Sequence, residues 1–156
     1  MKIIIPPHHK KAEPVKVLAE IREEAEEMLK LIKEKSFEGF WKNAYALSHP
    51  QVSEDPKSFF TVNMEDPYIQ ENFRSALIIN PIILASEDAR KEKEACMSSP
   101  WRKPWRVKRY HRITVEYWVP GWFGRLKKRR EVCTGLKAQI FQHEISHFEG
   151  NEYEPI

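Results

Sequence analysis

The fold is decided by the stretch Leu136-Lys-Ala-Gln-Ile-Phe-Gln-His143-Glu144-Ile-Ser-His147-Phe148, which carries a His-Glu-x-x-His motif and is stopped by Gly150. On a helix, residues four apart lie on the same face, about 6 Å from each other. His143 and His147 can therefore bind one metal ion, with Glu144 close enough to handle the proton of a bound water. The motif predicts a metal-assisted hydrolase. The alternative is a core helix whose two histidines are hydrogen-bonded.

Apolar residues occupy two opposite sides of this predicted helix. The two rows are Leu136, Ile140, His143 and His147, and Ala138, Phe141, Ile145 and Phe148. A surface helix has a single apolar stripe, whereas a helix with apolar residues on two sides is surrounded by other elements. We therefore expect the histidine helix to lie at the centre of the molecule.

The chain of 156 residues is long enough to bury a substantial core, and we expect a single domain over residues 1–156. No apolar run approaches membrane-spanning length, and the apolar part of Met1–Pro7 is too short for a secretory signal. Cys96 and Cys133 form no disulfide framework, which indicates a reducing compartment. We expect a cytoplasmic monomer without membrane contact.

The N-terminal part of the chain predicts a long helix on the outside of the fold. Apolar residues recur with helical spacing from Val15 to Lys35, and charged residues fill the opposite face. A coiled coil is the weaker alternative, because the stripe covers only about three heptads. Before this helix, Lys2–Ile5 has the pattern of a short strand that ends at two prolines.

The middle of the chain predicts strands and connections. Residues 44–52 resemble a packed loop leading into an edge strand, and Phe59–Val62 has the composition of a strand. Ala76–Leu84 predicts a strand kinked at an Asn-Pro pair. We expect a loop over residues 66–72 and a solvated turn over the charged residues 86–93.

A β-hairpin is predicted just before the histidine helix. Val107–Val119 alternates loosely, Pro120–Gly124 has turn composition, and Arg125–Val132 can return as the partner strand. The region is strongly basic and interleaved with aromatics, in two clusters at residues 101–112 and 125–130. Such a surface can bind RNA phosphates or stack on unpaired bases. A solvated strand edge that discourages edge pairing is the alternative.

Two imidazoles need a third protein ligand if one coordination position is to stay open for chemistry. A cysteine thiolate suits a first-row metal, and the chain offers two candidates. Cys96 lies in the segment Glu94-Ala-Cys96-Met-Ser98, and Cys133 lies just before the histidine helix. Either cysteine can instead be a small buried side chain. Spacing alone does not choose between them.

Three segments of the chain resemble, in order, the three motifs of the peptide deformylase family. Ala46-Leu-Ser-His-Pro-Gln51 is similar to the family's Gly-Leu-Ala-Ala-x-Gln, and Glu94-Ala-Cys96-Met-Ser98 to Glu-Gly-Cys-Leu-Ser. Gln142-His143-Glu144-Ile-Ser-His147 is similar to Gln-His-Glu-x-Asp-His. The resemblance covers nearly the whole chain. We expect an α+β fold, with antiparallel or mixed β-sheets wrapped around a central metal-binding helix and the long N-terminal helix outside.

The resemblance implies that Cys96, His143 and His147 hold one divalent metal ion, and that Cys133 is structural. Members of the family commonly use Fe(II), and zinc, nickel or cobalt can occupy the same site. Their activity removes the formyl group from the N-terminal methionine of newly made polypeptides. In that reaction a metal-activated water attacks the formyl carbon, while Glu144 acts as general base and then as general acid.

Further roles follow from the same resemblance. The side-chain amide of Gln51 and the backbone N–H of Met97 are expected to stabilise the developing oxyanion. Glu94 and Arg109 resemble an ion pair that braces the cysteine loop. The residues expected at the methionine pocket are Tyr45, Ala46, Leu136 and Gln139.

The chain also departs from the family motifs. Ala44 and Ala46 stand at glycine positions of the first motif, and Ala95 stands at a glycine position of the second. Ser146 replaces an aspartate, and Gln139 is polar for a methionine pocket. These changes leave every ligand and the acid in place, and they bear on substrate preference.

Two alternatives to a deformylase remain. One is a divergent, inactive relative that binds RNA or the ribosome through the basic hairpin at residues 101–130. The other is a metalloprotease, since His-Glu-x-x-His serves many peptidases. Short deformylases also occur in phages and organelles, and a phage-encoded chain is expected in the host cytoplasm.

Overall fold

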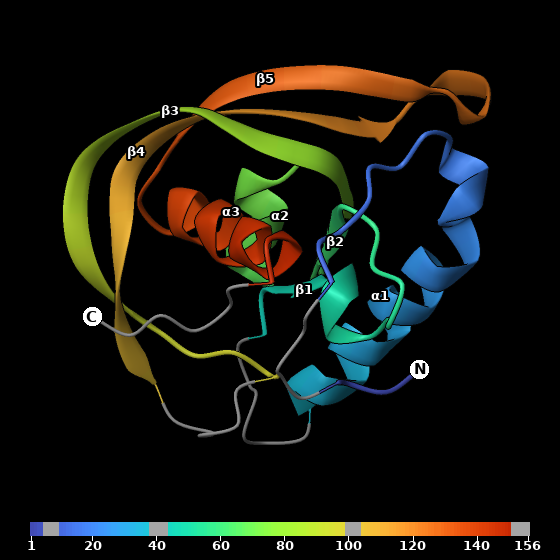
Figure 1. Ribbon diagram of the computed structural model, residues 1–156, viewed down its shortest axis with the longest axis horizontal. Coiled ribbons are helices and arrows are strands. Elements are labelled where there is room, and N and C mark those ends of the chain that lie inside the picture. Colours follow the sequence, from blue (N-terminus) through green and yellow to red (C-terminus); the bar gives the residue numbers. More distant parts are fainter. Residues whose placement is uncertain (5–9, 38–43, 99–103, 151–156) are drawn as a thin grey trace.

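The computed structural model describes every residue except 5–9, 38–43, 99–103 and 151–156. Its described strands form one five-stranded antiparallel sheet in the order β1-β2-β3-β4-β5, which curves around helix α3 (Figure 1). The strands are β1 (Ala46–Ser48), β2 (Phe59–Val62), β3 (Leu77–Glu94), β4 (Trp105–Pro120) and β5 (Leu126–Thr134). The α+β prediction is confirmed, in its antiparallel form.

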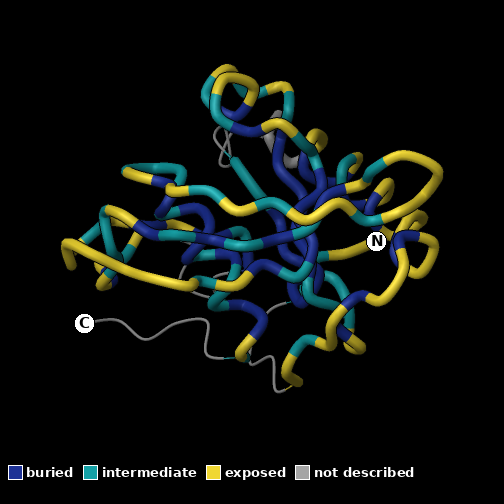
Figure 2. The backbone as a smooth tube through the Cα atoms, turned by 90° about the horizontal axis from the view of Figure 1, so that it is seen from above, coloured by how far each residue is buried: buried dark blue, intermediate teal, exposed yellow. Residues whose placement is uncertain are grey.

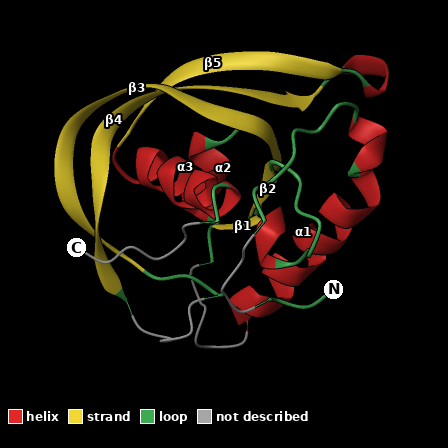
Figure 3. Ribbon diagram, in the orientation of Figure 1, coloured by secondary structure: helices red, strands yellow, loops and turns green. Residues whose placement is uncertain are grey.

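Helix α3 (Gly135–Phe148) lies inside the curve of the sheet, as predicted (Figure 3). Phe141 is fully buried, with its ring edge-on to Phe60 and stacked on Phe73. The side-chain amide of Gln142 donates to the Tyr110 carbonyl at 2.8 Å and accepts from the Tyr110 N–H at 2.7 Å. These contacts attach the helix to β4 and fix its rotation, which sets the direction of its histidines.

Helix α1 (Arg22–Phe37) packs on the outside of the sheet, which confirms its predicted position (Figure 3). Ile21, Ala25, Met28 and Ile32 are buried in one core cluster with Phe59 and Ile79. The predicted start at Val15 is wrong, because the helix begins at Arg22 after a 3-10 turn over Leu18–Glu20. The backbone of Val15 is instead hydrogen-bonded to the side chain of Asn80.

Strand β3 bends at the Asn-Pro pair, and the predicted kink is confirmed. Asn80 adopts a left-handed φ of 47°, and the pairing with β4 shifts between Ile79 and Ile82. The side-chain amide of Asn80 donates to the Val15 carbonyl and accepts from the Val15 N–H, both at 2.8 Å. Asparagine tolerates this conformation because its short polar side chain can bond locally.

The predicted turn over residues 86–93 is wrong, because β3 continues to Glu94 and pairs with β4 along this whole segment. Most of its residues are exposed, the class drawn in yellow in Figure 2, so apolar alternation carried no signal there. The segment is a strand because it pairs with β4. The continuation of β3 delivers Glu94 to the histidine helix.

The predicted loop over residues 66–72 is also wrong, because Pro67–Asn72 forms helix α2. The Asp66 carboxylate caps the helix by accepting from the N–H groups of Tyr68 and Ile69, and Pro67 stands in the first turn. An Asp-Pro pair is a known helix start and could have revealed it. No strand is assigned to residues 2–4 of the predicted strand Lys2–Ile5, and Ile5 lies outside the described residues.

The predicted hairpin is confirmed, with β4 and β5 paired from Arg112–Thr134 to Pro120–Leu126. At its tip, Trp122 is 85% exposed and Phe123 is 97% exposed. Phe123 and Gly124 both have positive φ, at 54° and 72°. Residues 101–103 of the basic region lie outside the described residues. Among the described helices, none is long and apolar enough to cross a membrane.

Candidate metal centre

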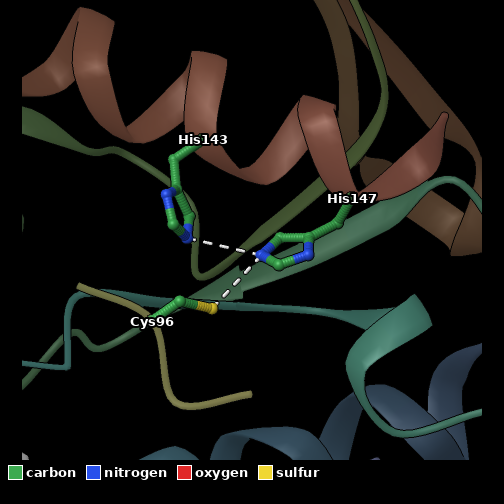
Figure 4. Close-up of side chains that lie close together, drawn as sticks. All are labelled: Cys96, His143 and His147. Atoms are coloured by element: carbon green, nitrogen blue, oxygen red, sulfur yellow. Dashed lines mark hydrogen bonds between the residues drawn. The ribbon is translucent and has the colours of Figure 1, made fainter. Parts of the chain in front are cut away.

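Three potential ligand atoms from two distant parts of the chain converge at α3. The Nε2 atoms of His143 and His147 are 3.3 Å apart, and His147 Nε2 lies 3.5 Å from Cys96 Sγ (Figure 4). The ligand atoms of all three residues lie within 4.8 Å of one another. Cys96 follows the end of β3, whereas the two histidines lie one turn apart on α3.

This arrangement fits a divalent metal ion. Metal–nitrogen bonds of about 2.0–2.1 Å and metal–sulfur bonds of about 2.3 Å place two ligand atoms roughly 3.3–3.7 Å apart in a tetrahedral site. The separations of 3.3 Å and 3.5 Å agree with this expectation. One thiolate with two imidazoles suits iron, zinc, nickel or cobalt, so the donor set indicates a first-row metal without selecting among them.

Glu94 joins the cysteine segment, α3 and β4. Its carboxylate accepts from Arg109 Nε at 2.7 Å and Nη2 at 2.9 Å, and it lies 2.7 Å from His143 Nδ1. Burial raises the pKa of Glu94, but the hydrogen bonds and charges of His143 and Arg109 outweigh it and lower this pKa to about 2. The ionised carboxylate makes His143 Nδ1 the donor, which leaves Nε2 directed at the other two ligand atoms.

The cysteine environment favours a thiolate. Burial raises the pKa of the Cys96 thiol, but the adjacent His147 and His143 outweigh this effect and lower it well below its usual value. Cys133 lies in a different environment, in the buried core cluster that contains Phe60, Phe73 and Phe141. Burial and then the Glu131 charge raise the pKa of the Cys133 thiol to about 12. The structure therefore places only one of the two cysteines at the histidines.

Glu144 lies on α3 between the two histidines and is 4% exposed. Its carboxylate Oε2 accepts a hydrogen bond from the Ser48 hydroxyl at 2.6 Å. Burial raises the pKa of the Glu144 carboxyl, against the lowering effect of the histidines and Ser48. A buried carboxylate with a raised pKa binds a proton more readily than an ordinary carboxylate, which suits a general base.

Gln51 approaches the same centre from the turn after β1. Its Nε2 donates to Cys96 Sγ at 3.1 Å and to Ser98 Oγ at 3.0 Å. Its Oε1 accepts from the Ser48 N–H at 2.8 Å, which fixes the amide with its donor side towards the cysteine. The half-buried Met97 stands between the two residues that this amide contacts.

The four predicted pocket residues lie in two parts of the chain. Tyr45 directly precedes β1, and Ala46 is its first residue. Leu136 lies on α3 and packs against the core cluster that contains Phe141. Gln139 is turned towards the end of β3, where its Nε2 donates to the Lys93 carbonyl at 3.2 Å. Hydrogen bonding to a strand carbonyl accounts for a glutamine at this position. Whether these four residues bind a methionine side chain stays a prediction.

Sequence reasoning missed the roles of two serines at this centre and of the histidine that follows one of them. Ser48 contacts Glu144, and Ser98 contacts Gln51 and lies 3.3 Å from Cys96 Sγ. His49 is 1% exposed and contacts Glu24 of α1. The sequence offered a sign of a special role for Ser48 and His49, because both are polar residues at positions where the resembled motif has alanine.

Known proteins resemble this chain in sequence and in fold. The sequence model described as polypeptide deformylase matches residues 4–153. A peptide deformylase of Thermus thermophilus is 30% identical over 149 residues, which cover 90% of this chain and 72% of that protein. One from Clostridium beijerinckii is 40% identical over 74 residues, or 47% of this chain and 49% of that protein.

The crystal structure of peptide deformylase from Thermotoga maritima superimposes with a TM-score of 0.73 at 25% identity and covers 96% of this chain and 91% of that one. The likeness therefore spans nearly the whole chain. On this evidence, the chain belongs to the polypeptide deformylase family.

Proposed function

We propose that this protein is a metal-dependent peptide deformylase, a hydrolase that removes the formyl group from the N-terminal methionine of newly made polypeptides and releases formate. The observation that carries the proposal is the convergence of Cys96, His143 and His147 within 4.8 Å, next to the buried carboxylate of Glu144. Membership of the family indicates formyl-Met peptides as the substrates. The cluster of Cys96, His143 and His147 indicates a metal-assisted hydrolysis.

Each residue then has a distinct task. The bound ion supplies a Lewis acid that activates water and polarises the formyl group. Glu144 takes the proton of the attacking water and returns it to the departing amine. Gln51 Nε2 and the Met97 N–H donate to the oxygen on which negative charge develops. Glu94, held by Arg109, keeps His143 in the tautomer that can bind the ion.

We propose Fe(II) as the native metal because members of the family commonly use it. Zinc, nickel or cobalt are proposed as replacements, because the thiolate and two imidazoles are compatible with all four metals. Elemental analysis of protein prepared under strictly anaerobic conditions tests this choice. Iron as the main metal is the expected result. Zinc as the main metal in such a preparation contradicts it.

The deciding experiment measures formate release from formyl-Met peptides by anaerobic, iron-loaded protein. We expect turnover by the native protein and a loss of about 100-fold or more in kcat for Glu144→Gln, which removes the proton acceptor. Metal content serves as the control, because the amide leaves all three ligands in place. No formate from metal-loaded native protein, or cleavage of internal peptide bonds instead, contradicts a deformylase.

The basic hairpin is proposed to contact ribosomal RNA. Trp122 and Phe123 project at its tip, and exposed Arg125 and Lys127 follow them. Exposed aromatics and cations together suit stacking on unpaired bases and binding to phosphates. Part of the positive charge is already neutralised, because Lys128 and Arg130 both pair with Glu116.

Replacing the basic residues of segment 125–130 with glutamine tests this contact by co-sedimentation with ribosomes. We expect reduced binding, and the native binding is expected to weaken as salt rises because phosphate contacts release counterions. A control pair, Lys16→Gln and Lys30→Gln, removes exposed positive charge elsewhere. Co-sedimentation that the hairpin substitutions leave unchanged contradicts the proposal.

We further propose that the chain forms a single domain and acts as a cytoplasmic monomer. The described strands form one sheet, which supports a single cooperative unit. Light scattering coupled to size-exclusion chromatography measures the molar mass in solution. A dimer mass that persists on dilution contradicts the monomer.

A further inference from the structure

Ser48 makes the hydrogen bond that orients the proposed general base. Its hydroxyl lies 2.6 Å from Glu144 Oε2 and 3.1 Å from the Glu144 carbonyl oxygen. A serine hydroxyl has one hydrogen to donate. A separation of 2.5–2.7 Å is characteristic of a hydroxyl donating to a charged carboxylate, so the shorter contact identifies the carboxylate as the acceptor.

The contact spans two elements that are far apart in the chain. Ser48 ends β1, Glu144 lies on α3, and 96 positions separate them. Ser48 is fully buried and Glu144 is 4% exposed. Among the described residues, the hydrogen bond from Ser48 to Oε2 is the side-chain contact that orients this carboxylate. The hydroxyl therefore holds one oxygen and leaves the other for the reacting groups.

The position of the hydroxyl is itself fixed by the turn that follows it. His49 Nδ1 accepts from the Lys57 N–H at 2.8 Å, and its Nε2 contacts the Glu24 carboxylate of α1. The His49 ring also stacks on Phe59, with ring centroids 4.6 Å apart. These three contacts hold His49, the residue next to Ser48, in place. The turn presents the hydroxyl at one place relative to α3.

Ser48 also fixes the side-chain amide of Gln51, through its backbone N–H and not through its hydroxyl. The Ser48 N–H donates to Gln51 Oε1 at 2.8 Å. A substitution of the side chain removes the contact with Glu144 and retains this backbone contact with Gln51. The two effects can therefore be separated by experiment.

We propose that Ser48 is a positioning residue, whose hydroxyl holds the Glu144 carboxylate in the orientation that takes the proton from the attacking water. The inference rests on the proposed deformylase function. Alanine, which stands at this position in the resembled motif, cannot make the contact, so this is a device of the present chain. Its expected effect is on turnover, since the contact of the hydroxyl is with the proposed general base.

Ser48→Ala is the test, on metal-loaded protein. We expect kcat to fall about ten- to a hundredfold, because a misplaced general base loses this order of rate, while KM stays within about twofold. The absorption spectrum of the cobalt-loaded variant is expected to match the native spectrum, because the ligands are untouched. A crystal structure of the metal-loaded variant is expected to show the Glu144 carboxylate displaced or in several rotamers.

A double-substitution cycle separates positioning from general bracing of β1 against α3. In a Glu144→Gln background, Ser48→Ala is expected to change the residual rate less than about twofold, since no carboxylate is left to orient. Thr61→Val is the matched control, because it removes a fully buried hydroxyl that bonds the Leu47 carbonyl beside Ser48. We expect this control to retain native kcat.

An equal loss of rate in both backgrounds, an altered cobalt spectrum, or an unmoved Glu144 carboxylate each overturns the inference. The crystallographic comparison stands apart from the assay. Native protein that releases no formate refutes the proposed function, whereas a carboxylate that keeps its place in Ser48→Ala refutes the role of Ser48.

Discussion

At the scale of single residues, two buried cysteines have opposite environments. Cys96 lies against His147 and is contacted by Gln51, whereas Cys133 lies in the apolar core. Neighbouring imidazoles lower the pKa of one thiol, and burial raises the pKa of the other. Since the thiolate is the form that binds metal, the environment decides which cysteine can be a ligand.

The two cysteines therefore form a matched pair for a test of metal binding. Cys96→Ala is expected to lose most of its bound metal, because two imidazoles alone hold an ion weakly. Cys133→Ala is expected to retain metal and activity, with stability lowered by about 1 kcal/mol. Metal analysis after dialysis and a denaturant titration measure both effects. Full metal retention in Cys96→Ala contradicts the ligand assignment and favours a peptidase-type site.

At the scale of elements, the short helix α2 depends on its cap. The Asp66 carboxylate accepts from Tyr68 N at 2.9 Å and from Ile69 N at 3.2 Å. These contacts satisfy N–H groups that the first helical turn leaves without partners. The cap also directs Ile69 and Phe73 into the core beside Phe141.

Removing this cap tests its contribution. Asp66→Ala is expected to lower the free energy of unfolding by about 1 kcal/mol, the usual cost of losing a helix N-cap. Urea titration measures the change. Glu71→Ala, at an exposed position near the end of the same helix, serves as the control and is expected to stay within about 0.5 kcal/mol of native. Equal stability of the two variants argues against the cap.

At the scale of the whole molecule, the candidate metal centre joins distant parts of the chain. Cys96 belongs to the segment after β3, the histidines belong to α3, and Glu94 is bonded to Arg109 of β4. An ion bound to these residues crosslinks the sheet to the central helix. Its binding free energy is then also folding free energy.

Removal of the metal is therefore expected to lower the melting temperature. An ion present at about 100 times its dissociation constant stabilises the folded state by about 2.7 kcal/mol, equivalent to roughly 5–10 °C for a domain of this size. Calorimetry with and without a chelator measures the shift. The Cys96→Ala variant is the control and is expected to respond little. A melting temperature that the chelator leaves unchanged in native protein contradicts this coupling.

The sequence by itself determined the central helix, the outer helix, the hairpin and the kinked strand. Each has a signal confined to a short window, such as helical spacing in Leu136–Phe148 or an Asn-Pro pair in β3. The deformylase resemblance also rested on local motifs. The extended part of β3 and the helix α2 were missed, the first because its pairing depends on β4 and the second because its Asp-Pro start was not used.

Only the tertiary structure decided which groups meet at the centre. Glu94 reaches His143 across 49 positions and Ser48 reaches Glu144 across 96, and neither contact has a spacing that a sequence can show. Both depend on how far β3 bends and on how Gln142 fixes the rotation of α3 against β4. Local periodicity determines which side of an element is buried. The curvature and register of a sheet, set by contacts along its whole length, determine what that side meets.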